Sequence, residues 1–423
     1  MSEENPPVEL LSPRAGLPEL ITDEASMRAC LEELAAGSGP IAIDAERASG
    51  YRFSQRAYLI QIFRRGGGLH LIDPIAVGDS HLWKEMSDLF ASEEWIIHAS
   101  TQDLPCLREV GLEPQRLFDT ELGGRIAGCE KVGLGPLAES LLHLSLAKEH
   151  SAVDWSLRPL REEWLNYAAL DVDVLVDLRD AVENLLREKG KLDWALQDFA
   201  AILKQPPAPP KKDPWRRTSG MHKVRDRPTL AIIRDMWDAR NDYAREIDIA
   251  PGRVFNDDAL MELVTKRPKE INDFAYILTK RSRLSGQPIE RWFDVYRKAL
   301  LTPLEELPEI RTPSTSLPPI KVWAQKNPEG YARITHARAR VATLAEELGM
   351  ATENLLSPEL LRKVSWDPPA DIAEYLRAVG AREWQIGLVT PVLEGAMLET
   401  EPLIVETPAE GESPTDQESE APQ

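Results

Sequence analysis

A short apolar segment with two acidic residues, Ile41-Ala-Ile-Asp-Ala-Glu46, is the feature that most constrains the fold of this chain. Its apolar residues predict a buried strand, and because side chains alternate along a strand, Asp44 and Glu46 share one face. Two adjacent carboxylates repel each other and lose hydration when partly buried. A divalent cation offsets both effects, since Mg²⁺ and Mn²⁺ prefer oxygen ligands. Taken alone, such a short motif favours a strand end whose acids face water.

The sequence around this segment predicts a mixed α/β sheet flanked by helices. A helix is expected from about Thr22, the predicted N-cap, to Ala36. Three glycines at 66–68 favour a turn between two of the strands, and helical patterns dominate from about residue 120 to 203. The expected strands cover residues 41–46, 58–63, 69–73, 95–98 and 117–119.

Two proline-rich stretches divide the chain, and the segments after each of them have apolar residues at helical spacing. No fixed-period repeat is evident, although the two helical segments could be domains of a similar kind. The expected organisation is a disordered N-terminus (1–18), an α/β domain (19–204), a linker (205–214), a helical domain (215–300), a second linker (301–319), a helical C-terminal domain (320–398) and a disordered acidic tail (399–423).

The charge is unevenly distributed. The chain of 423 residues has a net charge of −20, which taken whole argues against a nucleic-acid-binding protein. Residues 215–300, however, carry 18 basic and 13 acidic side chains, a net charge of +5. The three cysteines lack zinc-ligand spacing and are typical of a reducing compartment. No apolar run has the length of a signal or membrane-spanning segment, so a cytoplasmic protein is expected.

A third acidic candidate is Asp103, which follows a strand ending at His98 and falls in the first turn of a helix. Open α/β sheets place ligands at this edge. Taken alone, Asp103 is better explained by the positive end of the helix dipole, worth about 0.3–1 kcal/mol. His98 is expected to be a buried hydrogen-bonding side chain, and Gln61 to satisfy a buried polar group.

A helical pattern brings Tyr167 and Asp171 together, because residues four apart share a helix face. A phenol beside a carboxylate can orient a water molecule. The alternative is a tyrosine packed against the core with Asp171 at the surface. Asp173 and Asp177 turn away from Asp171 by about 200° and 240°, at about 100° per residue, and are expected to face solvent.

Together, the order D-x-E, then Asp103, then Y-x-x-x-D resembles DEDD-type 3′-5′ exonucleases of the tyrosine variant, and the chain resembles bacterial ribonuclease D. Supporting stretches are Leu59-Ile-Gln-Ile62, Leu71-Ile-Asp-Pro74 and Asp154-Trp-Ser-Leu-Arg-Pro-Leu160. The resemblance implies a ribonuclease H-like fold and release of nucleoside 5′-monophosphates from RNA 3′ ends, with a role in tRNA precursor processing. It implies that Tyr167 positions the attacking water, and that two Mg²⁺ or Mn²⁺ ions are bound by Asp44, Glu46, Asp103 and Asp171.

The helical segment 215–300 resembles an HRDC domain, an auxiliary nucleic-acid-binding module, and 320–398 resembles it more faintly. Basic residues near the start of the first segment are candidates for RNA contact: Arg216, Arg217 and Lys223. Lys148 and Arg158 are candidate phosphate contacts, although Arg158 could instead pair with Asp154. The expected partner is structured RNA, and a monomer is favoured. The rivals are an exonuclease acting on DNA, a catalytically silent RNA-binding protein and an interaction scaffold.

Overall fold

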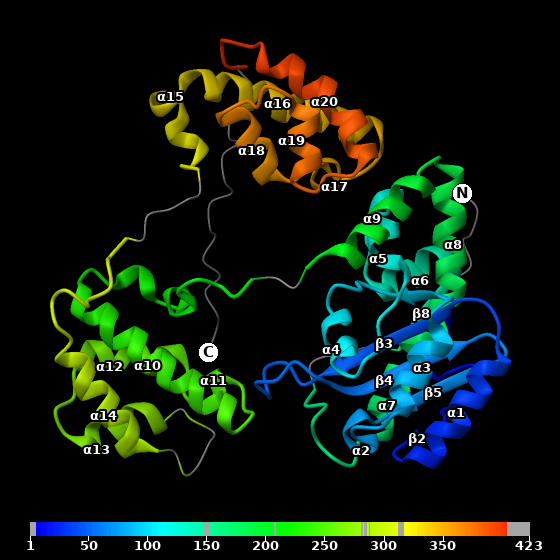
Figure 1. Cartoon of the computed structure of the whole chain (residues 1–423), viewed down its shortest axis with the longest axis horizontal. Helices are drawn as coiled ribbons and strands as arrows, with labels where there is room; N and C mark the ends of the chain where they lie inside the picture. Colours follow the sequence, from blue (N-terminus) through cyan, green and yellow to red (C-terminus); the bar gives the residue numbers. More distant parts are fainter. Residues whose placement is uncertain are drawn as a thin grey trace, which may run out of the picture. The chain divides into compact units, whose positions relative to one another are not determined.

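The computed structural model describes residues 6–147, 153–206, 209–280, 282, 286, 288–311 and 317–403. They belong to two compact units, one up to residue 314 and one from residue 315. The first unit contains a sheet with flanking helices, followed by a helical region, and the second unit is helical (Figure 1). Among the described residues, no helix combines the length and the apolar character needed to cross a bilayer.

The central sheet has six strands in the order β2-β5-β4-β3-β6-β7. Strands β3, β4 and β5 form the expected antiparallel meander, and the other pairings are parallel. Gly66 and Gly68 have positive φ angles of 74° and 83°, which explains the glycines in the β4–β5 turn. The expected strands are confirmed, and the bounds are β2 (Leu20–Ile21), β3 (Ile41–Arg47), β4 (Ala57–Arg64), β5 (Gly68–Ile72), β6 (Glu94–Ile97) and β7 (Arg116–Asp119).

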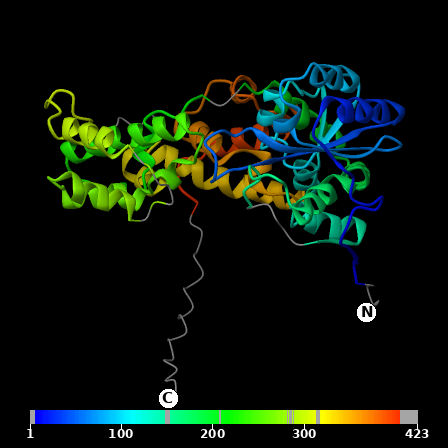
Figure 2. The same ribbon diagram turned by 90° about the horizontal axis from the view of Figure 1, so that it is seen from below.

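Helices cover both faces of this mixed sheet (Figure 2). Helix α7 packs against β3, β4 and β5. The N-cap of α1 is Asp23 and not the expected Thr22, because the Asp23 carboxylate accepts a hydrogen bond from the Ser26 amide at 2.8 Å. The helices are α1 (Glu24–Ala36), α2 (Pro74–Val77), α3 (Leu82–Phe90), α4 (Leu104–Glu109), α5 (Thr120–Ala127), α6 (Leu134–Leu142), α7 (Glu162–Asp173), α8 (Leu175–Glu188) and α9 (Leu192–Lys204).

The N-terminal segment is ordered from residue 6, so the expected disorder of residues 1–18 is wrong for its described part. Strand β1 (Val8–Leu10) pairs in parallel with β8 (Leu144–Leu146), a strand that the sequence patterns did not reveal. Partners more than 130 residues away supply the backbone hydrogen bonds that this polar, proline-containing segment lacks locally. Residues 1–5 lie outside the described residues.

The same segment overturns the expectation that Asp173 and Asp177 face solvent. Asp173 is buried, and its carboxylate lies 2.9 Å from Arg14 Nε. Asp177 is half-buried and pairs with Arg14 at 2.6 Å and with Arg65 at 2.7 Å. Helical geometry correctly turned these acids away from Asp171, but the side they face is covered by the N-terminal segment.

The helical region of the first unit is built around aromatic side chains. Trp292 and Tyr296 are fully buried, and Phe255 and Phe274 contact them at ring-centroid distances of 5.2 Å and 5.3 Å, respectively. The helices are η1 (Pro214–Arg217), η2 (Met221–Lys223), α10 (Arg227–Glu246), α11 (Pro251–Val254), α12 (Asp257–Lys266), α13 (Ile271–Thr279) and α14 (Ile289–Leu300).

The second unit has a long helix, α16, against which α18 and α20 pack. The expected tail begins in ordered structure, because Glu399 pairs with Arg340 and the Leu403 amide donates to Thr335 Oγ1 at 2.9 Å. Residues 404–423 lie outside the described residues. The helices are η3 (Ile320–Val322), α15 (Trp323–Lys326), α16 (Pro328–Glu347), α17 (Thr352–Leu355), α18 (Pro358–Trp366), α19 (Ile372–Ala378) and α20 (Glu383–Met397).

Candidate active site

Strand β3 presents Asp44 and Glu46 on the face that α7 covers. In the antiparallel pairing with β4, Asp44 lies opposite Gln61 and Glu46 lies opposite Leu59. Residues directly opposite each other in such a pair point to the same face. The strand interior is otherwise apolar and fully buried at Ile41 and Ile43, which holds the backbone of the two acids in place.

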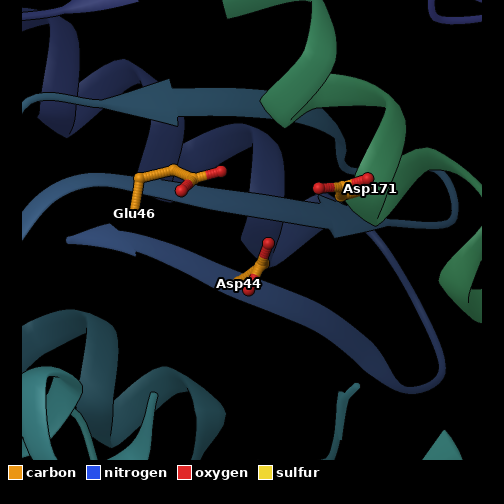
Figure 3. Close-up of side chains that lie close together, drawn as sticks. All are labelled: Asp44, Glu46 and Asp171. Atoms are coloured by element: carbon orange, nitrogen blue, oxygen red, sulfur yellow. The ribbon is translucent and has the colours of Figure 1, made fainter. Parts of the chain in front are cut away.

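Helix α7 adds the third carboxylate. One carboxylate oxygen from each of Asp44, Glu46 and Asp171 lies within 4.8 Å of the other two. Figure 3 shows the two acids on the strand and Asp171 reaching toward them from the helix. Tyr167, one turn before Asp171, makes a side-chain hydrogen bond to it. The helical spacing therefore brings the phenol and the carboxylate together at this cluster.

Asp103, the N-cap residue of α4 just after β6, interacts electrostatically with Asp44 and Glu46 but does not belong to the group of three whose oxygens lie within 4.8 Å of one another. It is buried, with 6% of its surface exposed; the charge of Asp44 raises the pKa of Asp103, and the charge of Asp103 raises the pKa of Glu46. Arg47 Nε lies 3.8 Å from the Asp103 carboxylate. Among the described residues the Asp103 side chain makes no capping hydrogen bond to α4, so the helix terminus alone does not explain its place beside Asp44 and Glu46.

The carboxylates of the cluster are close together and partly buried, so their negative charges repel one another. Burial, followed by repulsion from Asp44, Asp171 and Asp103, raises the pKa of Glu46 well above its ordinary value. Burial and Asp44 raise the pKa of Asp103 to about 8, and burial also raises the pKa of Asp44. Arg47 acts in the opposite sense on all three but does not compensate. A cation that enters such a cluster stabilises it, because it offsets the repulsion between the carboxylates.

Tyr167 stays protonated at neutral pH. Burial and the neighbouring carboxylate of Asp171 raise the pKa of its phenol, because a phenolate would add another negative charge to the cluster. The hydroxyl therefore remains a hydrogen-bond donor and acceptor, which suits a group that orients water and does not suit a base.

The turn that carries Asp103 is held by Asp119, a residue that the sequence patterns did not single out. Its carboxylate accepts hydrogen bonds from the Ser100 amide at 2.8 Å and from Ser100 Oγ at 2.7 Å. It also accepts from the amides of Ala99 and Leu122. The sequence contained one signal for this role. Asp119 ends β7, and β7 lies beside β6, the strand that precedes Asp103.

The sequence predictions for two other polar side chains, His98 and Gln61, have opposite outcomes. His98 is confirmed as a hydrogen-bonding histidine, with Nδ1 2.9 Å from Thr120 Oγ1, and burial lowers its pKa so that it is neutral. Gln61 was expected to satisfy a buried polar group. It is fully buried opposite Asp44, yet within the described part of the chain neither its amide nitrogen nor its oxygen has a hydrogen-bond partner.

Arg158 makes structural contacts, so the alternative pairing with Asp154 is wrong, whereas the phosphate contact stays a prediction. Its guanidinium pairs with Asp73 at 2.5 Å and 2.8 Å. The remaining N–H groups donate to the carbonyls of Trp155, Leu157 and Tyr58, which uses all five donors of the side chain. Lys148, the other candidate phosphate contact, lies outside the described residues.

Comparisons with known proteins agree with this geometry. A family model described as 3′-5′ exonuclease matches residues 18–187, one described as HRDC domain matches 229–292, and one described as 3′ to 5′ exonuclease C-terminal domain matches 316–397. A crystal structure of a protein from Bifidobacterium adolescentis is 35% identical, with a TM-score of 0.83, and covers 93% of this chain and 100% of its own.

Curated relatives include ribonuclease D of Psychromonas ingrahamii, which is 27% identical over 82% of this chain and 90% of its own length. Ribonuclease D of Acidiphilium cryptum is 29% identical over 68% of this chain and 74% of its own length. Ribonuclease D of Escherichia coli shares the fold, with a TM-score of 0.62 at 23% identity over 90% of this chain and 99% of that one.

The sheet, the carboxylate cluster and the matched models define a 3′-5′ exonuclease with a ribonuclease H-like catalytic domain and an HRDC domain. Such exonucleases use divalent metal ions, and the cluster of Asp44, Glu46 and Asp171 is the candidate site for them. Within this class, the chain is similar over most of its length to proteins named ribonuclease D.

Proposed function

We propose that this exonuclease trims RNA, releasing nucleoside 5′-monophosphates one at a time from the 3′ end. The observation that carries the proposal is the gathering of carboxylate oxygens from Asp44, Glu46 and Asp171 within 4.8 Å of one another. These donors fit Mg²⁺ or Mn²⁺, because both cations prefer oxygen ligands and offset the repulsion that raises the pKa of Glu46. We propose two such ions, held by Asp44, Glu46, Asp103 and Asp171.

Bound cations would supply a coordinated water of lowered pKa and positive charge beside the phosphate. The role of Tyr167 follows from its own chemistry. Its hydroxyl is tied to Asp171 and stays protonated, so we propose that it holds the attacking water in line with the scissile bond. Arg47 keeps Asp103 directed at the cluster through their 3.8 Å contact.

RNA as the substrate is supported by the relatives named ribonuclease D and by the basic charge of residues 215–300. The Escherichia coli relative is described as an exoribonuclease involved in structured RNA processing. Arg217 and Lys223 are exposed and suit phosphate contact. Arg216 is half-buried, stacks over Trp215 at 4.2 Å and pairs with Asp213 at 3.4 Å, so its contribution to RNA binding is smaller.

We extend the proposal to tRNA precursors as substrates, to action as a monomer and to a cytoplasmic location. The location is supported by the cysteines, which are free thiols at Cys30, Cys106 and Cys129, as expected for a reducing compartment.

The test is digestion of 3′-end-labelled and 5′-end-labelled RNA, and of DNA of the same sequence, with Mg²⁺ or Mn²⁺. We expect stepwise shortening of RNA that EDTA and Asp44→Asn abolish. Asp79→Asn is the matched control, because Asp79 is an exposed acid outside the cluster. Faster digestion of DNA would keep the chemistry and overturn the substrate. Binding of RNA without cleavage would favour a silent RNA-binding protein.

A second readout separates the metal site from activity. We expect Mn²⁺ to raise the melting temperature of the wild-type protein and of Asp79→Asn, but to have a much smaller effect on Asp44→Asn. Without metal, Asp44→Asn should melt at a higher temperature than wild type, since one of the repelling carboxylates is neutral. Equal Mn²⁺ stabilisation of all three proteins would contradict the assignment of Asp44 as a ligand.

A further inference from the structure

The loop that follows the catalytic strand β3 is seated on the HRDC domain. We call residues 48–56, between Arg47 of β3 and Ala57 of β4, the β3–β4 loop. It begins two residues after Glu46. The contacts described below lie within the first compact unit, which contains both the catalytic domain and the HRDC domain.

Polar contacts hold the middle of the loop to the HRDC domain. The Asp248 carboxylate accepts hydrogen bonds from the Ser54 amide at 2.7 Å and from Ser54 Oγ at 3.1 Å. The Tyr58 hydroxyl, at the start of β4, donates to the same carboxylate at 3.4 Å. The Ala250 amide donates to the Tyr51 carbonyl at 3.0 Å, so the loop and the HRDC domain are also joined through their backbones.

Aromatic side chains of the loop complete the contact. Phe53 packs against the hydrophobic core of the HRDC domain, and the Arg245 guanidinium lies 5.1 Å from its ring centroid. Arg253 stacks on Tyr51 at 3.9 Å and donates to the Gly50 carbonyl at 2.7 Å. An arginine face on an aromatic ring is an attractive contact, so these two stacks add to the hydrogen bonds.

On the HRDC side of the contact, the backbone conformation and the charge of Asp248 suit its role as acceptor. Asp248 has a φ of 49°, a left-handed conformation that aspartate adopts more readily than most residues. Although burial acts to raise it, the pKa of Asp248 is lowered because the Ser54 amide and hydroxyl donate hydrogen bonds to its carboxylate. The side chain is therefore a charged acceptor held at one position.

The other end of the loop leads into the catalytic cluster. The ladder between β3 and β4 shifts register between Glu46 and Arg47, so the direction of the strand end depends on the path of the loop. Arg47 contacts Asp103 at 3.8 Å. Arg52 Nε donates to Ser156 Oγ at 2.7 Å, which ties the loop to the segment leading into α7.

We propose that the HRDC domain positions the catalytic strand end through the β3–β4 loop, with Asp248, Tyr51 and Phe53 as positioning residues. The HRDC domain then acts on the chemical step as well as on RNA affinity. The inference rests on the proposed exonuclease activity, but it concerns how the site is held and not what the site does. It applies to substrates too short to reach the HRDC domain.

The test is steady-state kinetics of the full chain on a trinucleotide and on a long RNA, with Asp248→Lys and Asp248→Asn. Asp248→Lys replaces the shared acceptor with a cation, and Asp248→Asn keeps one acceptor oxygen and tolerates the left-handed backbone. Asp273→Asn is the matched control, since Asp273 is an exposed HRDC acid on α13. Amide hydrogen exchange of residues 48–56 reports whether the loop has been released.

We expect Asp248→Lys to increase exchange in the β3–β4 loop and to lower kcat on the trinucleotide by about 10-fold to 100-fold, the size of effect that a misplaced reacting group produces. Asp248→Asn should have a smaller effect in both measurements, and the control none. A released loop with unchanged trinucleotide kcat, or a rise in KM on long RNA alone, would overturn the coupling. Unchanged exchange in Asp248→Lys would overturn the docking itself.

The two proposals fail in different ways. A wild-type protein that cleaves neither RNA nor DNA would contradict the exonuclease activity while leaving the exchange measurement to decide the docking. If Asp248→Lys exposes amides throughout the HRDC domain, the variant has unfolded that domain, and Asp248→Asn and Ser54→Ala then decide the outcome. Ser54→Ala removes one hydroxyl donor and keeps the backbone contact, so its expected effect is the smallest.

Discussion

The HRDC domain and the second compact unit repeat one order of helices at a constant spacing. Helices α10, α11, α12 and α13 begin at residues 227, 251, 257 and 271, and α16, α17, α18 and α19 begin at 328, 352, 358 and 372. Each start is displaced by 101 residues from its counterpart. A buried tryptophan in a short helix precedes each set, Trp215 in η1 and Trp323 in α15.

The local signals at the helix starts also correspond. Asp226 and Asn327 cap the two long helices, and a proline follows in the first turn of each. Asn256 and Ser357 cap α12 and α18 in the same way. The final helices depart from the rule, since α14 begins at residue 289 and α20 at 383. These correspondences support the prediction that residues 320–398 are HRDC-like, which stays a prediction.

The two regions share an order of helices but differ in charge. Residues 215–300 have a net charge of +5, whereas residues 320–398 carry 9 basic and 10 acidic side chains, a net charge of −1. Attraction to phosphate depends on cationic side chains and is independent of the helical scaffold. Similar scaffolds therefore need not carry the same function, and we expect RNA binding to follow the surface charge.

The largest expected effects test whether the two tryptophans have equivalent roles. Trp323 is fully buried, packs on Trp366 at 4.8 Å and donates to the Pro318 carbonyl at 2.7 Å. We expect Trp323→Ala and Trp215→Ala each to lower the free energy of unfolding of its own region by about 3–5 kcal/mol. Urea unfolding followed by circular dichroism measures this.

The matched control is Tyr276→Ala, an exposed aromatic with 65% of its surface accessible, for which a change within about 0.5 kcal/mol is expected. A neutral Trp323→Ala would show that the short helix before α16 is not part of the second core. The correspondence between the two regions would then be limited to the helices that follow.

Charge reversal sharpens the functional difference. We expect Arg217→Glu combined with Lys223→Glu to weaken RNA binding by about 10-fold at moderate salt, because each lost phosphate contact reduces counterion release. The equivalent change in the second unit, Lys321→Glu with Lys326→Glu, reverses two exposed lysines and should leave binding within about twofold. Fluorescence anisotropy at several salt concentrations measures both pairs. Equal losses would break the functional distinction.

The smallest effect is expected where the acidic tail begins. Glu399 pairs with Arg340 of α16, and both side chains are more than a third exposed. Because exposed ion pairs contribute little, Glu399→Gln should change the free energy of unfolding by less than about 1 kcal/mol. Thermal unfolding at low and high salt checks this.

Removing residues 404–423 should leave exonuclease activity within a few-fold, and loss of activity would assign the tail a role that the proposal does not include.

Local patterns predicted much of the catalytic domain. The alternation of residues 41–46 gave the shared face of Asp44 and Glu46, and helical spacing gave the pairing of Tyr167 with Asp171. These features depend on neighbours only two to four residues away. The meander followed from three apolar runs separated by short turns.

Contacts between distant segments could not be predicted in this way. Arg158 pairs with Asp73, 85 residues earlier, although Asp154 was the nearer candidate in sequence. The spacing of 101 residues between the helical regions is not apparent in the sequence, because the helix starts repeat while the side chains between them differ. Asp248, which contacts the β3–β4 loop, lies 194 residues from its partner Ser54.

The position of Arg14 changes where the catalytic domain should be said to begin. The exonuclease family model starts at residue 18, so a protein cut at that boundary would lack both β1 and this arginine. Asp173 would then keep a buried carboxylate without its cation, two residues beyond Asp171 in the same helix. A truncation at this family boundary would therefore remove a contact that holds α7 in place. The resulting loss of activity would be mistaken for the loss of a catalytic group.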